Sequence, residues 1–267
     1  MKIAQYILAG CLVAVSFAAS AQTLPAKYKT AGALNVAMFP AFPPLAYKDP
    51  KTNEMIGIDV EIGNAIGADL GIKINWVDVT YEAAIPSMKT ERIDFALSLV
   101  NLPESQDALN FIDYIQSGAQ FFVLDTNKSQ FTTPTSLCGQ SVGASRRAPF
   151  VREMDKWSAA NCTGKPAIVS VGTEGSADAR SQLKQGRLQG VVQSAESIPY
   201  AMAQEPGVYA LVGTPFTDSH ISIGFEKGNT ELRDVIKASF NRLISNGKYE
   251  AILAKYGLAH LKVGPRN

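Results

Sequence analysis

The sequence predicts an α/β protein built from two similar units that follow one another along the chain. Strand-like apolar runs alternate with helical patterns in a β-α-β-α-β order, and the same alternation then returns further along. This order is typical of a sheet with helices on both faces. The first unit is predicted to have strands at 34–39, 72–77 and 95–100 and helices at 57–71 and 81–90.

In the first of these helices, isoleucines recur at helical spacing. Asp59 and Glu61 stand in the first turn, where the helix dipole favours acids, and Gly71 is a suitable stop. The second unit is predicted to have strands at 120–124, 141–144, 167–171, 188–193, 208–212 and 221–225 and helices at 150–160, 176–185 and 198–204, before helices at 232–246 and 249–256. Both units are small, so we expect two lobes with a ligand cleft between them.

Composition indicates a globular protein and excludes some partners. The chain has 267 residues, of which 46% are hydrophobic and 18% charged, and its formal net charge is +1. This balance does not favour nucleic acid or a strongly acidic surface as a partner.

Residues 1–21 are predicted to be a secretory signal peptide. Lys2 precedes an apolar run that is short for a bilayer span, and Ala19-Ser20-Ala21 has the pattern of a cleavage site. A lipoprotein anchored at Cys11 is the alternative, although too little apolar sequence precedes that residue. We expect an exported, soluble protein in the periplasm.

Once the signal peptide is removed, Cys138 and Cys162 remain. In an oxidising compartment such a pair is most simply one disulfide. With only His220 and His260 elsewhere, these thiols do not have the spacing of a zinc site.

The segment from Ser98 to Gln106 is predicted to form one wall of the cleft. It follows the buried run at 95–100 and contains Asn101 and Pro103, which are unsuited to a buried strand. In open α/β sheets, ligands bind beyond the carboxyl ends of strands. An ordinary loop between elements is the alternative.

Several short motifs, in this order and spacing, resemble one known family. These are Phe42-Pro43-Pro44-Leu45, Gly57-Ile58-Asp59-Val60-Glu61-Ile62, Ile85-Pro86-Ser87-Met88 leading to Arg92-Ile93-Asp94, Leu183-Lys184-Gln185-Gly186-Arg187-Leu188, and Asn246-Gly247-Lys248-Tyr249 to Lys255-Tyr256-Gly257. The chain resembles the periplasmic solute-binding proteins that supply polar amino acids to ABC importers, the family 3 extracellular solute-binding proteins.

The resemblance implies two α/β lobes joined by two hinge strands. The first lobe would comprise 22–122 and 221–267, and the second 123–220. A small solute would bind between the lobes and favour their closed form, which the membrane permease of the importer would recognise. We expect no cofactor, no metal and a monomer.

The resemblance also implies roles for individual residues of the first lobe. Phe42 and Tyr81 match aromatic residues that cover the ligand, and buried core aromatics are the alternative. The arginine that usually holds a ligand carboxylate falls on Ser105 or Gln106, and neither is basic. Ser98 and Asn101 remain as polar contacts. 

In the second lobe, the acid that usually meets a ligand ammonium falls on Ser194. Glu196 is either a substitute cation contact or a solvated helix start. Arg146 and Arg147 precede a predicted helix, where they could hold an anion, and an ordinary surface basic pair is the alternative.

Both charge anchors for a zwitterion are therefore altered. The ligand is an amino acid held by other residues, or an organic acid held by Arg146 or Arg147, or transport binding has been lost. We expect capture of an amino acid or related carboxylate for an ABC importer. The alternatives are an enzyme on the same fold, similar to cyclohexadienyl dehydratase, with His220 and Glu196 as its loose candidates, and a ligand-binding sensor.

Overall fold

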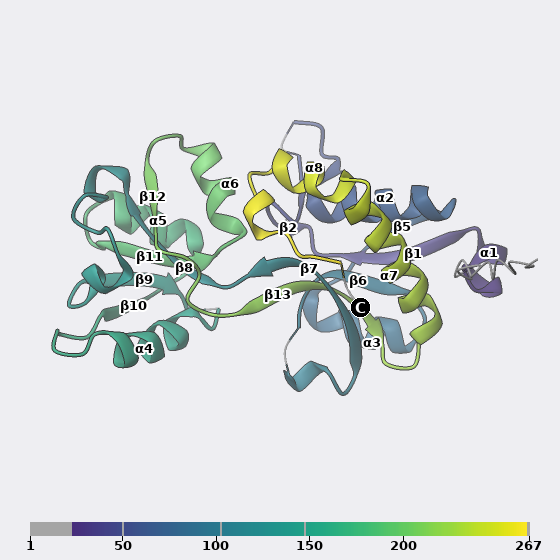
Figure 1. Cartoon of the computed structure of the whole chain (residues 1–267), viewed down its shortest axis with the longest axis horizontal. Helices are drawn as coiled ribbons and strands as arrows, with labels where there is room; N and C mark the ends of the chain where they lie inside the picture. The colour runs from purple at the N-terminus through teal and green to yellow at the C-terminus, as the bar shows by residue number, and fades with distance from the viewer. Residues whose placement is uncertain (1–22, 50, 102, 147, 266–267) are drawn as a thin grey trace, which may run out of the picture.

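Two five-stranded sheets, each in its own lobe, dominate the fold (Figure 1). The structure is a computed structural model that describes residues 23–49, 51–101, 103–146 and 148–265. The first sheet has the order β5-β1-β6-β13-β7 and the second the order β10-β9-β11-β8-β12. The α/β fold class with two lobes, predicted from the sequence, is confirmed.

The first lobe contains the beginning and the end of the described chain. Its sheet is formed by β1 Ala33–Met38, β5 Lys73–Asp78, β6 Phe95–Val100, β7 Leu109–Ser117 and β13 Ser219–Glu226. Its helices are α1 Ala26–Ala31, α2 Ile58–Leu70, α3 Ala84–Lys89, α7 Thr230–Ser245 and α8 Lys248–Lys255, with 3-10 turns at Tyr81–Ala83, Pro103–Ser105 and Ala259–Leu261. A small sheet is formed by β2 Ala41–Phe42, β3 Ala46–Lys48 and β4 Met55–Ile56.

The second lobe is formed by the middle of the chain. Its strands are β8 Ala119–Leu124, β9 Ser141–Ser145, β10 Val169–Thr173, β11 Gly190–Ser194 and β12 Tyr209–Val212. Its helices are α4 Phe150–Asn161, α5 Ser176–Lys184 and α6 Ser197–Gln204, with 3-10 turns at Asp125–Asn127 and Pro134–Leu137.

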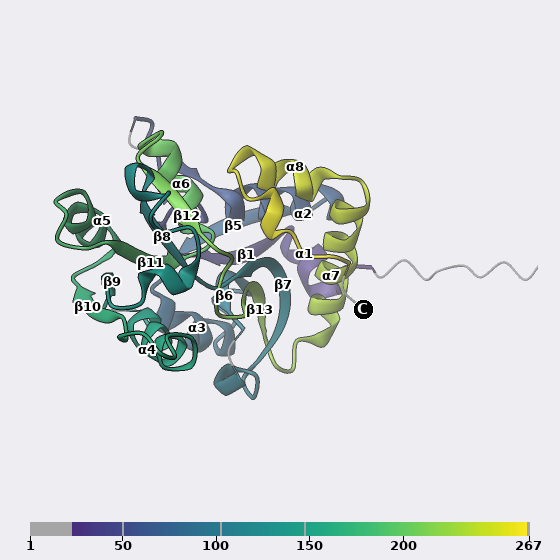
Figure 2. The same cartoon turned by 60° about the vertical axis from the view of Figure 1, so that its left-hand side comes forward.

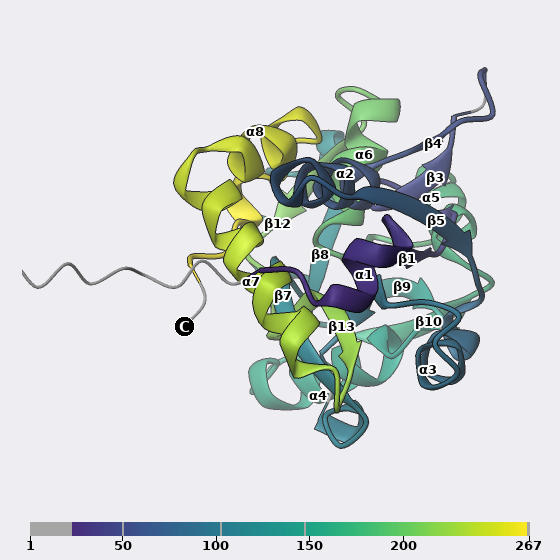
Figure 3. The same ribbon diagram turned by 90° about the vertical axis from the view of Figure 1, so that its right-hand side faces the viewer.

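Each sheet is covered by helices on both faces, as the alternating order predicts. In the first lobe, α2, α7 and α8 pack on one face and α3 on the other. Figures 2 and 3 show α3 apart from these three helices. In the second lobe, α4 covers one face, while α5 and α6 cover the other. Burial of apolar side chains on both faces supplies the main stabilisation of each lobe.

The chain passes between the two sheets at Gly118 and again between Val212 and Ser219. The two crossings are hydrogen-bonded together, because the Ala119 N–H donates to Oγ1 of Thr217 at 2.7 Å. Gly118 has φ +152°, and a Cβ there would lie 2.1 Å from the Thr217 carbonyl oxygen, so only glycine fits. The predicted boundaries at 122 and 220 lie inside β8 and β13, a little beyond these crossings.

Most predicted elements are present with shifts at their ends. Gly57 and Gly71 flank α2, and Gly71 adopts the left-handed conformation of a helix stop, as predicted. The prediction of one helix at 81–90 was wrong, because that segment is a 3-10 turn followed by the short helix α3. None of the described helices is long and apolar enough to cross a membrane. The predicted signal peptide at residues 1–21 lies outside the described residues.

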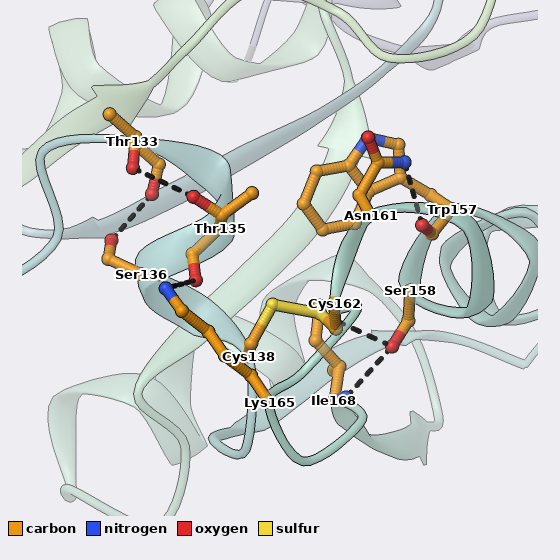
Figure 4. Close-up of a disulfide and its surroundings, with 10 residues drawn as sticks. All are labelled: Thr133, Thr135, Ser136, Cys138, Trp157, Ser158, Asn161, Cys162, Lys165 and Ile168. Carbon is orange, nitrogen blue, oxygen red and sulfur yellow. Dashed lines mark hydrogen bonds between the residues drawn. A yellow bond between two sulfur atoms is a disulfide. The ribbon is translucent and has the colours of Figure 1, made fainter.

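A disulfide joins Cys138 to Cys162, as predicted (Figure 4). It links the turn before β9 to the end of α4, and both cysteines are buried in the core beneath that helix. The Ser158 hydroxyl accepts a hydrogen bond from the Ile168 N–H at 2.9 Å, which ties α4 to the residue just before β10. The end of α4 is therefore attached to its surroundings both by the disulfide and by a hydrogen bond.

Reduction of this disulfide should lower the free energy of unfolding by about 3 kcal/mol, because the bond closes a loop in the unfolded chain. The sequence separation is 24 residues. A loss of that size corresponds to a fall in melting temperature of about 6–12 °C. Thermal unfolding with and without reductant measures it, and the variant carrying both Cys138→Ala and Cys162→Ala should not respond to reductant. An unchanged midpoint in the reduced parent would contradict the prediction.

Candidate functional site

The carboxyl ends of the parallel strands in both sheets lie on the side of the hinge. In the first sheet, Val100 at the end of β6 pairs with Ile221, near the start of β13. In the second sheet, Ser194 at the end of β11 pairs with Ala119, which directly follows the crossing. Strands β1 and β5 run parallel to each other and β1 to β6, and β9 and β10 run parallel to β11. The residues that follow these six strands are therefore carried to the junction of the lobes, where α/β sheets bind ligands.

Two exposed aromatic residues follow the strand ends of the first sheet. Phe42 is 54% exposed and Tyr81 is 41% exposed, which is unusual for large apolar side chains in this protein. The Tyr81 ring packs 5.3 Å from that of Phe39, and its hydroxyl accepts a hydrogen bond from the Val100 N–H at 3.3 Å. Neither is a buried core aromatic. Their predicted role as ligand contacts stays a prediction, and their positions are suited to it.

Asn101 and Gln106 form a connected amide network beside these aromatics. The Gln106 side-chain amide donates to Oδ1 of Asn101 at 2.9 Å, and the Asn101 amide donates to Oδ1 of Asp113 at 3.1 Å. The Ser222 hydroxyl donates to the same Asp113 oxygen at 2.7 Å. The structure thus brings two predicted site residues together with Asp113, which the sequence reading missed. An isolated acid inside the apolar strand β7 was the available signal.

Ser98 lies deeper than a cleft-wall residue. It has φ +57° and sits in a β-bulge, where Leu97 and Ser98 oppose the single residue Ile223. Ser98 is 8% exposed, and its hydroxyl donates to Oδ2 of Asp59 at 2.5 Å. Because this bond uses the only hydroxyl proton, Ser98 could face a ligand only as an acceptor. Its predicted ligand contact remains untested.

Asp59 accepts hydrogen bonds from two hydroxyls in the interior of the first lobe. The second comes from Tyr114 at 2.5 Å, and the Tyr114 oxygen in turn accepts from the Ser98 N–H at 3.1 Å. Asp59 is fully buried, and loss of hydration raises its pKa to about 6, even though both hydroxyls favour the carboxylate. The sequence predicted only a favourable first-turn acid, and no sequence pattern indicated this burial.

In the second lobe, Arg146 is exposed and already paired. Its guanidinium donates to the Gly172 carbonyl oxygen at 3.0 Å and lies 2.9 Å from Oε1 of Glu174. The ion pair with Glu174 means that an anion held by Arg146 would have to compete with this carboxylate, and the predicted anion contact stays a prediction. Arg147 lies outside the described residues.

Ser194 and Glu196 lie where β11 ends and α6 begins. The Ser194 hydroxyl donates to Oγ of Ser197 at 3.1 Å. The reading of Glu196 as a solvated helix start was wrong, because Glu196 is only 6% exposed and accepts a hydrogen bond from the Ser117 hydroxyl. Its location at the crossing between the lobes explains the burial.

Two surface hollows of about 410 and 490 Å³ lie elsewhere on the first lobe. Neither is lined by a predicted site residue. Within the part of the chain that the structure describes, no group of three or more His, Cys, Asp or Glu side chains could hold a metal ion. The strand ends at the hinge therefore remain the candidate site.

Comparison with known proteins agrees with this arrangement. The pattern of the bacterial extracellular solute-binding proteins, family 3, matches residues 34–259. The chain belongs to this family. The resemblance predicted from the short motifs is confirmed, and the match spans both lobes of this solute-binding protein.

Curated relatives cover most of this solute-binding protein. The L-arginine-binding protein of Pseudomonas aeruginosa is 29% identical over 225 residues, which is 81% of this chain and 84% of the relative. The ABC transporter glutamine-binding protein GlnH of Bacillus subtilis is 27% identical, over 78% of this chain and 75% of the relative.

Solved structures show the same fold. The second substrate-binding domain of Lactococcus lactis GlnP, in an open conformation, superposes with a TM-score of 0.77 at 20% identity and covers 88% of this solute-binding protein and 97% of that chain. ArgBP from T. maritima gives a TM-score of 0.62 at 23% identity, over 86% of this chain and 97% of that one.

Asp59→Asn should change how stability depends on pH. Because the folded pKa of Asp59 is raised to about 6, its ionisation costs roughly 3 kcal/mol more in the folded protein than in the unfolded chain. Stability linked to the protonated form is present below about pH 4 and is lost as the pH rises through about 6. Between about pH 4 and about pH 6, the free energy of unfolding of the parent, measured with urea, should therefore fall by up to roughly 3 kcal/mol relative to that of Asp59→Asn.

The matched control is Asp69→Asn on the same helix. Arg242 donates to the Asp69 carboxylate and lowers its pKa, so this acid contributes stability that is lost as the pH falls. The stability of the parent relative to Asp69→Asn should therefore rise, not fall, as the pH rises. The change should be small because the ion pair is partly exposed. A parent and an Asp59→Asn variant with parallel pH profiles would contradict the assignment.

Proposed function

We propose that this protein captures a small polar organic solute, an amino acid or a related carboxylate, between its lobes and delivers it to an ABC importer. The observation that carries the proposal is the placement of both carboxyl strand edges at the hinge, with Phe42 and Tyr81 exposed there. A ligand that touches both edges favours one arrangement of the lobes over the other by its additional contacts.

Named relatives support the solute class. Among them are proteins named for binding arginine, glutamine and histidine. Aromatic faces, amides and hydroxyls at the strand ends are suited to a small polar solute of this kind. All of the relatives named here are binding proteins, and we propose binding without turnover for this chain.

The charged groups of the site leave two solute types in competition. At Ser105, Gln106 and Ser194 this chain lacks the charges expected for a zwitterion. An anionic solute would instead be held by Arg146 or Arg147. The Arg146–Glu174 ion pair is exposed, and such pairs contribute only about 0–1 kcal/mol, so the arginine can exchange Glu174 for a ligand carboxylate at little cost.

The remaining parts of the proposal concern the setting. We propose export by the signal peptide at residues 1–21, a monomeric protein in the periplasm, and a membrane permease of an ABC importer as its partner. The family description as extracellular and the curated names that include ABC transporters support this setting.

Thermal unfolding of residues 22–267 against a solute panel tests the function. The panel contains α-amino acids, polyamines, small dicarboxylates and aromatic acids. A solute at 100 times its dissociation constant should add about 2.7 kcal/mol and raise the midpoint by roughly 5–10 °C. A shift with zwitterions alone would assign an amino acid, and one with anions alone would assign an organic acid. No shift with any member would contradict solute capture of this class.

Phe42→Ala and Tyr81→Ala should each weaken binding of the solute found in that panel. Loss of one aromatic contact that a ligand buries costs about 1.5–3 kcal/mol, or roughly 10- to 150-fold in dissociation constant by calorimetry. Val169→Ala is the matched control, because Val169 is also 54% exposed but lies at the start of β10, away from the carboxyl ends. Equal affinities for the parent and both aromatic variants would rule out these contacts.

A further inference from the structure

The segment from Ser194 to Tyr200 belongs to the second lobe but is packed against the first. The Ala195 N–H donates to the Gly118 carbonyl oxygen at 2.9 Å, and the Ala195 side chain is part of the first lobe's apolar core. The Glu196 carboxyl accepts from the hydroxyl of Ser117, the last residue of β7. These contacts hold the end of β11 on the hinge strand.

The first turn of α6 adds two more contacts with the first lobe. The Tyr200 ring meets the Tyr47 ring of β3 edge-on, with centroids 5.5 Å apart. A Cβ on Gly257, just after α8, would lie 3.7 Å from Cβ of Pro199. Figure 1 shows α6 on the side of the second lobe nearest α8 and β2. The segment therefore touches the first lobe at the hinge strand, the small sheet and the end of α8.

Glu196 is the one acid in this set of contacts. Among the described residues, the groups that act on its carboxyl are the hydroxyls of Ser117 on β7 and Ser194 on β11 and its own backbone N–H, and none of them is charged. A buried carboxylate without a cation is costly, whereas the neutral acid fits the same hydroxyl partners. Separation of the lobes would return the carboxyl to water.

We propose that residues 194–200 form an interlobe latch with Glu196 as its proton-sensitive member. The neutral acid holds the lobes in the arrangement described above, and ionisation releases them. The latch acts without solute, so it is independent of which solute the protein captures.

The direction of the pH effect follows from burial. Burial raises the pKa of Glu196 in the latched arrangement, so protonation favours that arrangement and rising pH favours separation. The effect begins above the ordinary Glu pKa of about 4.3 and is complete once the pH exceeds the raised value. The Tyr47–Tyr200 ring contact adds an apolar component to the latch.

Interlobe distances in solute-free protein test the latch. Spin labels at Lys73→Cys on the first lobe and Lys156→Cys on the second use exposed positions, and the native cysteines remain in their disulfide. The parent should give one distance population at about pH 5 and a second, growing population at about pH 8. Glu196→Gln, which stays neutral, should keep the first population at both values.

Two further variants complete the design. Tyr200→Ala should shift the population ratio toward separation about twofold to tenfold at both pH values, because an aromatic pair is lost. Glu205→Gln is the matched control on the same lobe, since Glu205 accepts hydrogen bonds from Lys184 and Tyr209, which both belong to the second lobe. It should respond to pH as the parent does.

A parent whose distances do not change with pH would overturn the proposal, as would a Glu196→Gln variant that responds like the parent. If Glu196→Gln fails to fold, Ser117→Ala keeps the test decisive, because loss of the hydroxyl should favour separation at both pH values. Since no solute is present, a failed solute panel and a failed latch remain distinguishable.

Discussion

The buried carboxylate of Asp59 is the interaction on which the first lobe depends. It joins the start of α2 to the bulge of β6 and to Tyr114 on the hinge strand β7. The Tyr114 carbonyl oxygen accepts from the Tyr249 hydroxyl at 2.6 Å, which extends the connection to α8. Four elements are thus held by one network in the interior, where hydrogen bonds are strong and unpaired groups are costly.

This network also determines where the site residues lie. The bulge at Ser98 comes two residues before Val100, whose N–H meets Tyr81, and three before Asn101. A bulge changes the direction of the strand that follows it. The aromatic and amide side chains at the hinge are therefore positioned by an acid that is fully buried beneath the surface of the site.

The alternation of strands and helices could be predicted because it depends on local hydrophobic periodicity and on residues such as Gly71, which ends a helix. The strand β7 was not assigned, because it lies in the sheet beside β13, far along the chain, and its neighbours are not visible in local sequence. The sequence predicted where the candidate site residues lie along the strands, but not which hydrogen bonds they make or which of them are buried. Phe42, Tyr81, Asn101 and Gln106 are at the strand ends, as expected. The burial of Ser98, Asp59 and Glu196 arises from tertiary packing between segments that are distant in sequence.

The placement of β13 has a consequence for how the chain acquires its structure. In the first sheet, β13 lies between β6 and β7, although the whole second lobe separates it from them in sequence. The strand β7 pairs only with β13 in that sheet, so a chain emerging from its amino end leaves β7 without a partner until residue 226 is available. The second lobe is continuous in sequence and carries its own disulfide, so it can assemble earlier. During synthesis the first lobe therefore lacks β13, the strand between β6 and β7, at a stage when the second lobe can already fold.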